Sequence, residues 1–312
     1  MGSDVVVGID GGGSKTLALL ADAQGRIVGR GMAGPSNYQA VGAEQAWQAL
    51  EAALQAALAD AQILRQEVRA VCLGLAGVDR PADLALVHEW ASRQWAGLPV
   101  MIVNDAQLVL AAGTPAGCGV ALISGTGSIA YGARPDGQSA RAGGWGHLLG
   151  DEGSGYAIGL AALRAVVRAA DGRGPATRLH GAVLEQWGLG APESLIQRMY
   201  VDGIAAVEIA TLTPVVVRSA AEGDGVAQAI IDDGCMELAL AAVSVVRQLD
   251  LTSPVPCALA GGVLVHLPVM ATGLRVAAQQ LGVLFEPVMS VTEPAMGAVK
   301  LAIRQLEQQG AH

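Results

Sequence analysis

Runs of apolar residues separated by glycine-rich turns open the chain. The first three runs are DVVVGID, LALLAD and RIVGRGM, at residues 4–10, 17–22 and 26–32. Such short apolar runs bounded by turn residues predict three strands in a meander, with the loop GGGSKT between the first two. The theme returns later as the strand GVALIS, the turn GTGS, the strand IAYGA and the hairpin turn RPDG. This weak internal repeat predicts a duplicated α/β unit.

Helical and strand patterns alternate through the rest of the first half. Trp47, Leu50, Leu54 and Leu58 recur at spacings of three and four, which predicts a helix from about Ala43. The runs VRAVCLGLAG and PVMIVND read as buried strands, separated by a helix that starts at a proline. Strands that alternate with helices indicate a partly parallel sheet.

The second half is mostly helical between its two groups of strands. Three- and four-residue spacing predicts helices from Asp151 to about Leu249. The elements expected after them are a strand in PVPCALAGG, a helix from about Pro268, a strand in VLFEPV and a last helix over 295–309. The restart of the pattern gives an N-terminal lobe of residues 1–114 and a C-terminal lobe of residues 115–312, with the last helix expected to pack back on the first lobe.

Composition and charge exclude several classes of protein. The 312 residues are 52% hydrophobic and 15% charged, which is unlike a disordered chain. The net charge is −9 and the only lysines are Lys15 and Lys300, so no basic track for nucleic acid or anionic membrane is present in the sequence. The uncharged stretch Leu251–Leu274 contains prolines and paired glycines that would break a spanning helix. We therefore expect a cytoplasmic protein without a signal peptide.

The cysteines and histidines do not form a metal-ligand pattern. Cys72, Cys118, Cys235 and Cys257 are widely separated, and the five histidines are also scattered. We therefore expect neither zinc nor an iron–sulfur cluster.

The first glycine loop, GIDGGGSKT, superficially matches a phosphate-binding P-loop. Ser14 stands where that motif needs glycine, and a strand follows where it needs a helix. The remaining feature is a glycine hairpin with Asp10 at the end of its first strand. Its backbone N–H groups can approach phosphate, and the carboxylate can hold hydrated Mg²⁺. A plain β-hairpin is the alternative interpretation.

The second glycine loop, GTGSIA, fits the loose dinucleotide pattern at Gly125, Gly127 and Ala130. A turn follows it instead of a helix, so no helix N-terminus meets a pyrophosphate there. A second phosphate hairpin over Gly125–Ser128 is the better functional interpretation.

Two further segments carry acidic residues at positions suited to a ligand. Asp105 ends the strand PVMIVND, at the edge where side chains point into the crevice of an open α/β sheet, although a helix cap is an alternative role. In GGWGHLLGDEGSGYAIG, glycines surround Trp145, and Asp151 and Glu152 precede two further glycines. A carboxylate beside an apolar ring is typical of a sugar site, and a glycine-rich helix cap is the alternative.

In this order, the motifs resemble those of the superfamily of acetate kinases, sugar kinases, heat-shock cognate ATPases and actin. The chain is most similar there to the N-acetylglucosamine kinase family, within the group of ATPases that includes activators of benzoyl-CoA reductase and 2-hydroxyacyl-CoA dehydratase. The motifs are GIDGGGSKT, GPSN, VND, LISGTGS, GGWGHLLGDEGS, LAGG and AMGAVKLA. The resemblance implies two ribonuclease H-like, actin-like ATPase lobes, each a mixed sheet flanked by helices, with a cleft between them.

The resemblance also implies roles for individual residues. Asp105 would be the general base for the sugar 6-hydroxyl, and Asp10 would position Mg²⁺ through water. The residues implied to bind the sugar are Asn37, Asp105, Gly144, Trp145, Gly146 and Asp151. Those implied to bind ATP are Gly11, Gly12, Gly13, Ser14, Lys15, Gly125, Thr126, Gly127, Gly261 and Gly262.

The expected activity is ATP-dependent and Mg²⁺-dependent phosphorylation of N-acetylglucosamine to its 6-phosphate. Glucosamine, N-acetylmuramic acid and glucose remain alternative acceptors, as does a sugar-independent ATPase or activator. The implied partners are ATP and an amino sugar. Because related kinases often form dimers, a homodimer is the assembly that the resemblance favours.

Overall fold

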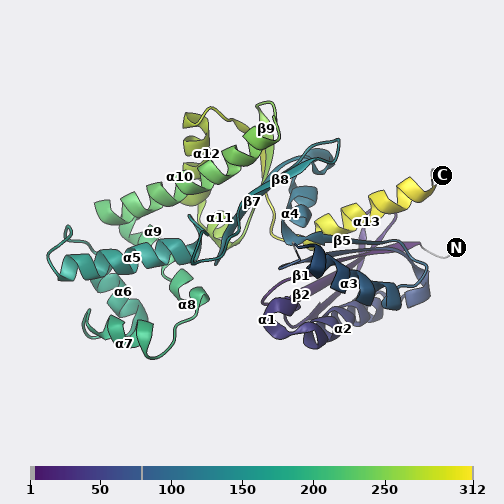
Figure 1. Cartoon of the computed structure of the whole chain (residues 1–312), viewed down its shortest axis with the longest axis horizontal. Coiled ribbons are helices and arrows are strands. Elements are labelled where there is room, and N and C mark those ends of the chain that lie inside the picture. The colour runs from purple at the N-terminus through teal and green to yellow at the C-terminus, as the bar shows by residue number, and fades with distance from the viewer. Residues whose placement is uncertain (1–3, 79, 311–312) are drawn as a thin grey trace. The chain divides into compact units, whose positions relative to one another are not determined.

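The computed structural model describes residues 4–78 and 80–310 and divides into two compact units. Unit 1 comprises the described part of Met1–Gly117 with Glu293–His312, and unit 2 comprises Cys118–Thr292. Each unit contains one five-stranded sheet (Figure 1). The sequence prediction of an α/β protein with two mixed sheets flanked by helices is confirmed.

The sheet of unit 1 has the strand order β3-β2-β1-β4-β5. Strands β1, β2 and β3 pair antiparallel, as the predicted meander requires, whereas β4 and β5 add parallel to β1. The strands are β1 Val5–Gly11, β2 Thr16–Asp22, β3 Ile27–Ala33, β4 Val68–Leu75 and β5 Val100–Asn104. The helices are α1 Tyr38–Val41, α2 Ala43–Ala61, α3 Pro81–Gln94, α4 Asp105–Gly113 and α13 Ala295–Gly310, with short 3₁₀ turns at Arg65–Glu67 and Pro115–Gly117.

The side chains of β1 alternate between two separate hydrophobic cores, one on each face of the sheet. Val5, Val7 and Ile9 face α2 and α3, while Val6 belongs to the core formed with α4 and α13 on the opposite face (Figure 1). Helix α13 approaches β1 so closely that a methyl group at Gly8 would lie 2.5 Å from the backbone nitrogen of Val299. The C-terminal segment is therefore part of the packing of unit 1.

The sheet of unit 2 repeats the topology of the first, with the order β8-β7-β6-β9-β10 when read in the matching direction. The strands are β6 Gly119–Ser124, β7 Ser128–Ala133, β8 Ser139–Gly143, β9 Val255–Ala260 and β10 Phe285–Ser290. The helices are α5 Gly155–Ala170, α6 Leu179–Trp187, α7 Ser194–Tyr200, α8 Ala206–Ala210, α9 Thr213–Ala221, α10 Gly225–Gln248, α11 Gly262–His266 and α12 Pro268–Gln280. The long helix α10 packs on β6, β7 and β8, and also contacts α5, α9 and α12 (Figure 1).

Strand β10 begins two residues later than the run VLFEPV suggested. The backbone N–H of Val283 bonds to the carbonyl of Ala278 at 2.9 Å, and that of Leu284 bonds to Ser253 Oγ at 3.0 Å. Pairing with β9 consequently starts at Phe285. Among the described residues, no helix is both long and apolar enough to cross a membrane.

Candidate functional site

The first glycine loop is a β-hairpin, because β1 and β2 pair antiparallel up to Gly11 and Thr16. The N–H of Gly12 closes the turn on the carbonyl of Lys15 at 3.0 Å. Its own carbonyl accepts bonds from the N–H groups of Ser36 and Asn37 at 3.0 and 3.2 Å. The hairpin and the loop that carries Asn37 are therefore fastened together.

The glycines of this hairpin differ in what surrounds them. A methyl group on Gly11 would lie 2.5 Å from Ser36 Oγ and 2.6 Å from Leu75 Cδ2, whereas one on Gly13 would meet nothing within 4 Å. Gly13, Ser14 and Lys15 are exposed. Gly11 thus has a packing role, and the tip of the hairpin is open to a ligand.

This difference yields a matched pair of variants. Gly11→Ala is expected to destabilise the protein by about 1–3 kcal/mol, since the new methyl group overpacks the site. Gly13→Ala is expected to change the free energy of unfolding by less than about 0.5 kcal/mol. Urea unfolding of both variants measures the contrast, and equal stability would contradict the packing role.

Asp10 and Asp105 are the acidic pair of unit 1. Asp10 lies in β1 one residue before the strand ends, and Asp105 is the first residue of α4, directly after β5. Burial raises the pKa of Asp10 to about 6, the Asp105 charge contributes in the same direction, and Lys15 opposes both. The two carboxyl groups are therefore close enough to interact electrostatically.

Helix α4 does not need Asp105 as its cap. Asn104 is the N-cap residue, and its side-chain oxygen accepts the N–H of Gln107 at 2.9 Å. The helix-cap role that the sequence left open for Asp105 thus belongs to Asn104. A carboxylate in the first turn is also favoured by the helix dipole.

The Asn37 loop is held from two sides. The side-chain oxygen of Asn37 caps the short helix α1 by accepting the N–H of Gln39 at 3.1 Å. The side chain of Gln39 donates to the carbonyl of Gly77 at 2.8 Å, and the hydroxyl of Tyr38 donates to Asp83. These contacts fix the loop against the segments that follow β4.

In unit 2, the second glycine loop is also a hairpin, between β6 and β7. The carbonyl of Gly125 accepts the N–H of Gly155 at 2.7 Å, and that of Thr126 accepts the N–H of Tyr156 at 3.3 Å. The hairpin is therefore joined to the start of α5. No dinucleotide-type helix begins at the hairpin itself.

Asp151 connects this hairpin to the loop around Trp145. Burial raises the pKa of Asp151. Its carboxylate accepts hydrogen bonds from the backbone N–H groups of Ser128 and Gly146, which offset part of this rise. The residue is buried and has a positive φ of 60°, an uncommon conformation outside glycine. The predicted sugar residues of unit 2 thus share one strained, hydrogen-bonded loop.

Trp145 has a neighbour that the sequence reasoning missed. Gly143, Gly144 and Gly146 have φ values of 76°, 71° and 81°, and in this turn Trp145 lies beside Arg141 of β8, whose Cζ is 5.4 Å from the centre of the indole ring. No sequence motif singles out this arginine.

Gly261 and Gly262 lie beside the second hairpin. A methyl group at Gly261 would be 2.2 Å from the carbonyl oxygen of Ser124, so only a glycine fits that approach. A pocket of about 430 Å³ lies next to them. Its lining comprises Gly125, Thr126, Gly155, Val207, Ala210, Thr211, Thr213, Pro214, Gly262, Val263, His266 and Leu267.

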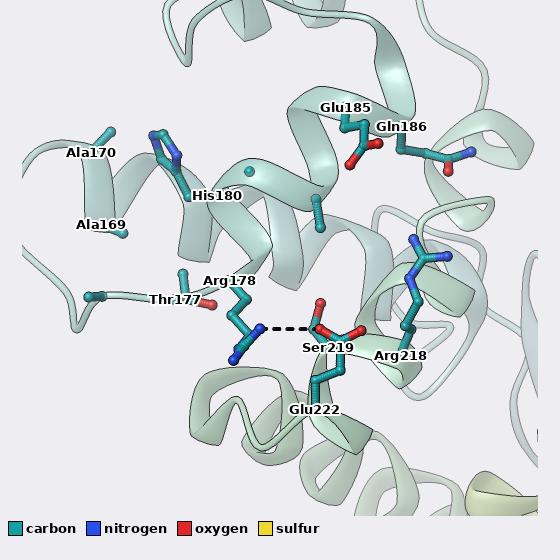
Figure 2. Close-up of a pocket in the computed structure, with 13 residues that line it drawn as sticks. Ala169, Ala170, Thr177, Arg178, His180, Glu185, Gln186, Arg218, Ser219 and Glu222 are labelled. Atoms are coloured by element: carbon teal, nitrogen blue, oxygen red, sulfur yellow. Dashed lines mark hydrogen bonds and ion pairs between the residues drawn. The ribbon is translucent and has the colours of Figure 1, made fainter.

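The side chains from α8 and α9 in this pocket were not predicted, because these helices carry no motif. A larger cavity of about 1030 Å³ lies between α6 and α9 and contains none of the predicted residues. Arg178 and Glu222 face each other within it (Figure 2). The Nη1 atom of Arg178 lies 3.4 Å from Oε2 of Glu222. Across the described part of the chain, no group of three or more His, Cys, Asp or Glu side chains is arranged to hold a metal ion.

Comparison with known proteins identifies relatives over nearly the whole chain. The model of the BadF/BadG/BcrA/BcrD ATPase family matches residues 7–302. An N-acetylmuramic acid/N-acetylglucosamine kinase of Clostridium acetobutylicum is 38% identical over 260 residues, covering 83% of this chain and 85% of its own. An N-acetyl-D-glucosamine kinase of Dictyostelium discoideum is 33% identical, covering 97% of this chain and 99% of its own.

A solved structure supports the same relationship at the level of the fold. It is described as that of a candidate N-acetylglucosamine kinase from Chromobacterium violaceum, with a TM-score of 0.75 and 27% identity over 97% of this chain and 100% of that chain. The predicted family resemblance and the actin-like kinase fold of the units are confirmed.

Proposed function

The chain belongs to the BadF/BadG/BcrA/BcrD ATPase family, and we propose that it transfers the γ-phosphoryl group of ATP to the 6-hydroxyl of N-acetylglucosamine. Two relatives more than 30% identical to it are named as amino-sugar kinases, which supports an ATP-dependent amino-sugar kinase as the general activity. Beyond this general activity, we propose N-acetylglucosamine as the acceptor and its 6-hydroxyl as the position that is phosphorylated.

The observation that carries the proposal is the grouping of Asp105, Asp10, the open hairpin tip and the Asn37 loop in unit 1. An acceptor hydroxyl needs one base, and a phosphate needs backbone N–H groups and a cation. In the reaction, Asp105 takes the proton of the sugar 6-hydroxyl while the oxygen of that hydroxyl forms a bond to the γ-phosphorus. The bond from that phosphorus to the bridging oxygen of ADP breaks, and ADP leaves with the electron pair.

The acidic pair also suits a divalent cation. Asp10 carries a raised pKa because burial and Asp105 disfavour its charge, and a cation nearby would offset both effects. Because the described residues offer no cluster of three metal ligands, ATP oxygens and water would complete the coordination. We assign Asp10 to hold hydrated Mg²⁺, which would neutralise charge on the phosphates.

The remaining residues fall into two groups under this proposal. Asn37, Gly144, Trp145, Gly146 and Asp151 bind and orient the sugar. The glycines of both hairpins, with Ser14, Lys15 and Thr126, contact phosphate, while Gly261 and Gly262 lie beside adenosine. The 430 Å³ pocket next to Gly262 has a mostly apolar lining, which suits a nucleoside.

The proposal is tested by ADP release from Mg-ATP, first alone and then with each candidate sugar. We expect a low rate with ATP alone and a steep increase with N-acetylglucosamine, larger than with glucosamine or glucose. A rate that no sugar increases would contradict it and favour an ATPase or activator. The homodimer and the cytoplasmic location expected from the sequence stay predictions, and sedimentation of the purified protein tests the first.

A further inference from the structure

We propose that Tyr38 is a positioning residue for the acceptor sugar, because it holds the neighbouring Asn37 in place through a hydrogen bond to Asp83. This inference rests on the proposed function, since it takes Asn37 as a residue that binds the sugar. It adds Tyr38 and Asp83, to which no sequence motif gives a role, to the residues that set the affinity for the sugar.

The side-chain amide of Asn37 has a defined orientation. Its oxygen accepts the N–H of Gln39 at 3.1 Å, and a methyl group on Gly77 would lie 3.0 Å from the same oxygen. Within residues 4–78 and 80–310, its nitrogen takes part in no hydrogen bond. The amide N–H donors are therefore the part of Asn37 that remains for a sugar oxygen, and their direction depends on where the loop is held.

Helix α1 cannot hold this loop by its own packing. It has four residues and buries none of them, and a single helical turn is unstable by itself. The N–H groups of Ser36 and Asn37 fasten the start of the loop to the carbonyl of Gly12. Beyond that point, the loop depends on side chains that reach the neighbouring helices.

The hydroxyl of Tyr38 reaches the first turn of α3. It donates to one oxygen of Asp83, a residue that is only 8% exposed. The other oxygen of Asp83 accepts the N–H of Arg80 at 3.1 Å, so the carboxylate is itself fixed to the start of α3. A hydrogen bond to a buried carboxylate is stronger than one between neutral groups, which makes Asp83 a firm anchor.

The ring of Tyr38 is held as well as its hydroxyl. It stacks on Trp47 of α2, with the ring centres 6.3 Å apart and 24° between the ring planes. Trp47 stacks in turn on Trp90 of α3, at 4.9 Å and 13°. Stacking on a tryptophan that is itself stacked restricts the ring to one place relative to α2 and α3. The backbone of the preceding residue, Asn37, is restricted with it.

The test is the affinity of Tyr38→Phe for N-acetylglucosamine, since this variant keeps the stacked ring and loses only the hydroxyl. We expect KM for the sugar to rise about tenfold, as the loss of a hydrogen bond to a charged group would give. Turnover at saturating sugar and KM for ATP should change by less than about twofold. An unchanged KM for the sugar would show that the bond supports only the fold, and would overturn the proposal.

A second arm asks whether Tyr38 acts through Asn37. Asn37→Asp keeps an oxygen that can cap α1 but has no amide donor, so it should bind the sugar about tenfold more weakly. Adding Tyr38→Phe to this variant should weaken binding little further, because no donor is left to position. Calorimetric titration with N-acetylglucosamine measures each dissociation constant, and effects that simply multiply would contradict the proposal.

Two further variants make the result interpretable. Asp83→Asn keeps a hydrogen-bond acceptor without the charge, so KM for the sugar should rise by about threefold, less than in Tyr38→Phe. It decides the matter if Tyr38→Phe does not fold, since a KM equal to that of the natural protein would overturn the proposal. Tyr200→Phe is the matched control, because it removes the same hydroxyl from a tyrosine that is 83% exposed in unit 2. Its KM for the sugar should equal that of the natural protein.

The outcomes separate this inference from the proposed function. If the natural protein phosphorylates N-acetylglucosamine and Tyr38→Phe has the same KM for it, the role of Tyr38 is wrong and the kinase proposal stands. If the natural protein phosphorylates no amino sugar, the proposed function is wrong and the role of Tyr38 falls with it.

Discussion

Asp105→Asn is expected to lower kcat for sugar phosphorylation by about a hundredfold to ten-thousandfold, the range over which a positioned general base contributes. The amide has nearly the shape of the carboxylate but cannot take the proton of the acceptor hydroxyl. Initial rates of ADP release with saturating sugar measure the change, and KM for ATP should change much less.

The variant is expected to fold, which makes the result interpretable. Asn104 caps α4 and keeps its bond to Gln107, so replacing Asp105 removes no helix cap. Glu89→Gln, a surface acid on α3, is a suitable control for loss of one negative charge. Near-normal turnover in Asp105→Asn would show that another group is the base.

Asp10→Asn is expected to raise stability and lower activity together. Because the folded-state pKa of Asp10 is about 6 against an ordinary 3.8, the folded protein holds this proton more tightly than the unfolded chain. The associated stability is fully present below about pH 3.8 and is lost as the pH rises toward 6. The neutral amide avoids that loss, so the metal-free variant should be more stable than the natural protein by about 1–3 kcal/mol above pH 6.

Thermal unfolding between pH 5 and pH 8 in the presence of a chelator measures this effect. The advantage of Asp10→Asn should be smaller at pH 5 than at pH 8. Its kinase activity at saturating sugar should fall by about tenfold to a hundredfold, as for residues that orient a metal ion. A variant that is less stable at pH 8, or fully active, would contradict the assigned role.

The fold could be predicted from the sequence because its signals are local. Strand, glycine loop and strand follow one another twice, and the strand LALLAD after the loop GGGSKT excludes a P-loop by itself. The repeated order of strands in the two sheets then follows from the repeated pattern. The predicted start of β10 was two residues too early, because the N–H of Val283 bonds locally to the end of α12 and that of Leu284 bonds to Ser253 Oγ.

The candidate site was only partly predictable, since some of its residues are brought together by backbone turns and helices that carry no sequence motif. Arg141 contacts Trp145 where three glycines adopt positive φ, and no motif marks that arginine. Val207 of α8 and Thr211, directly after that helix, line the pocket beside Gly262, although α8 carries no sequence signature. The pKa of Asp10 likewise depends on burial and on Asp105, which is distant in sequence.

The most direct test of the account is the structure of the product formed from ATP, Mg²⁺ and N-acetylglucosamine. Phosphorus–proton correlation NMR of the reaction mixture reports which sugar protons couple to the new phosphate. We expect a phosphate coupled to the two protons on carbon 6, formed in step with ADP and nearly absent with Asp105→Asn. ADP accompanied by free phosphate, or a phosphate attached at another sugar position, would contradict it.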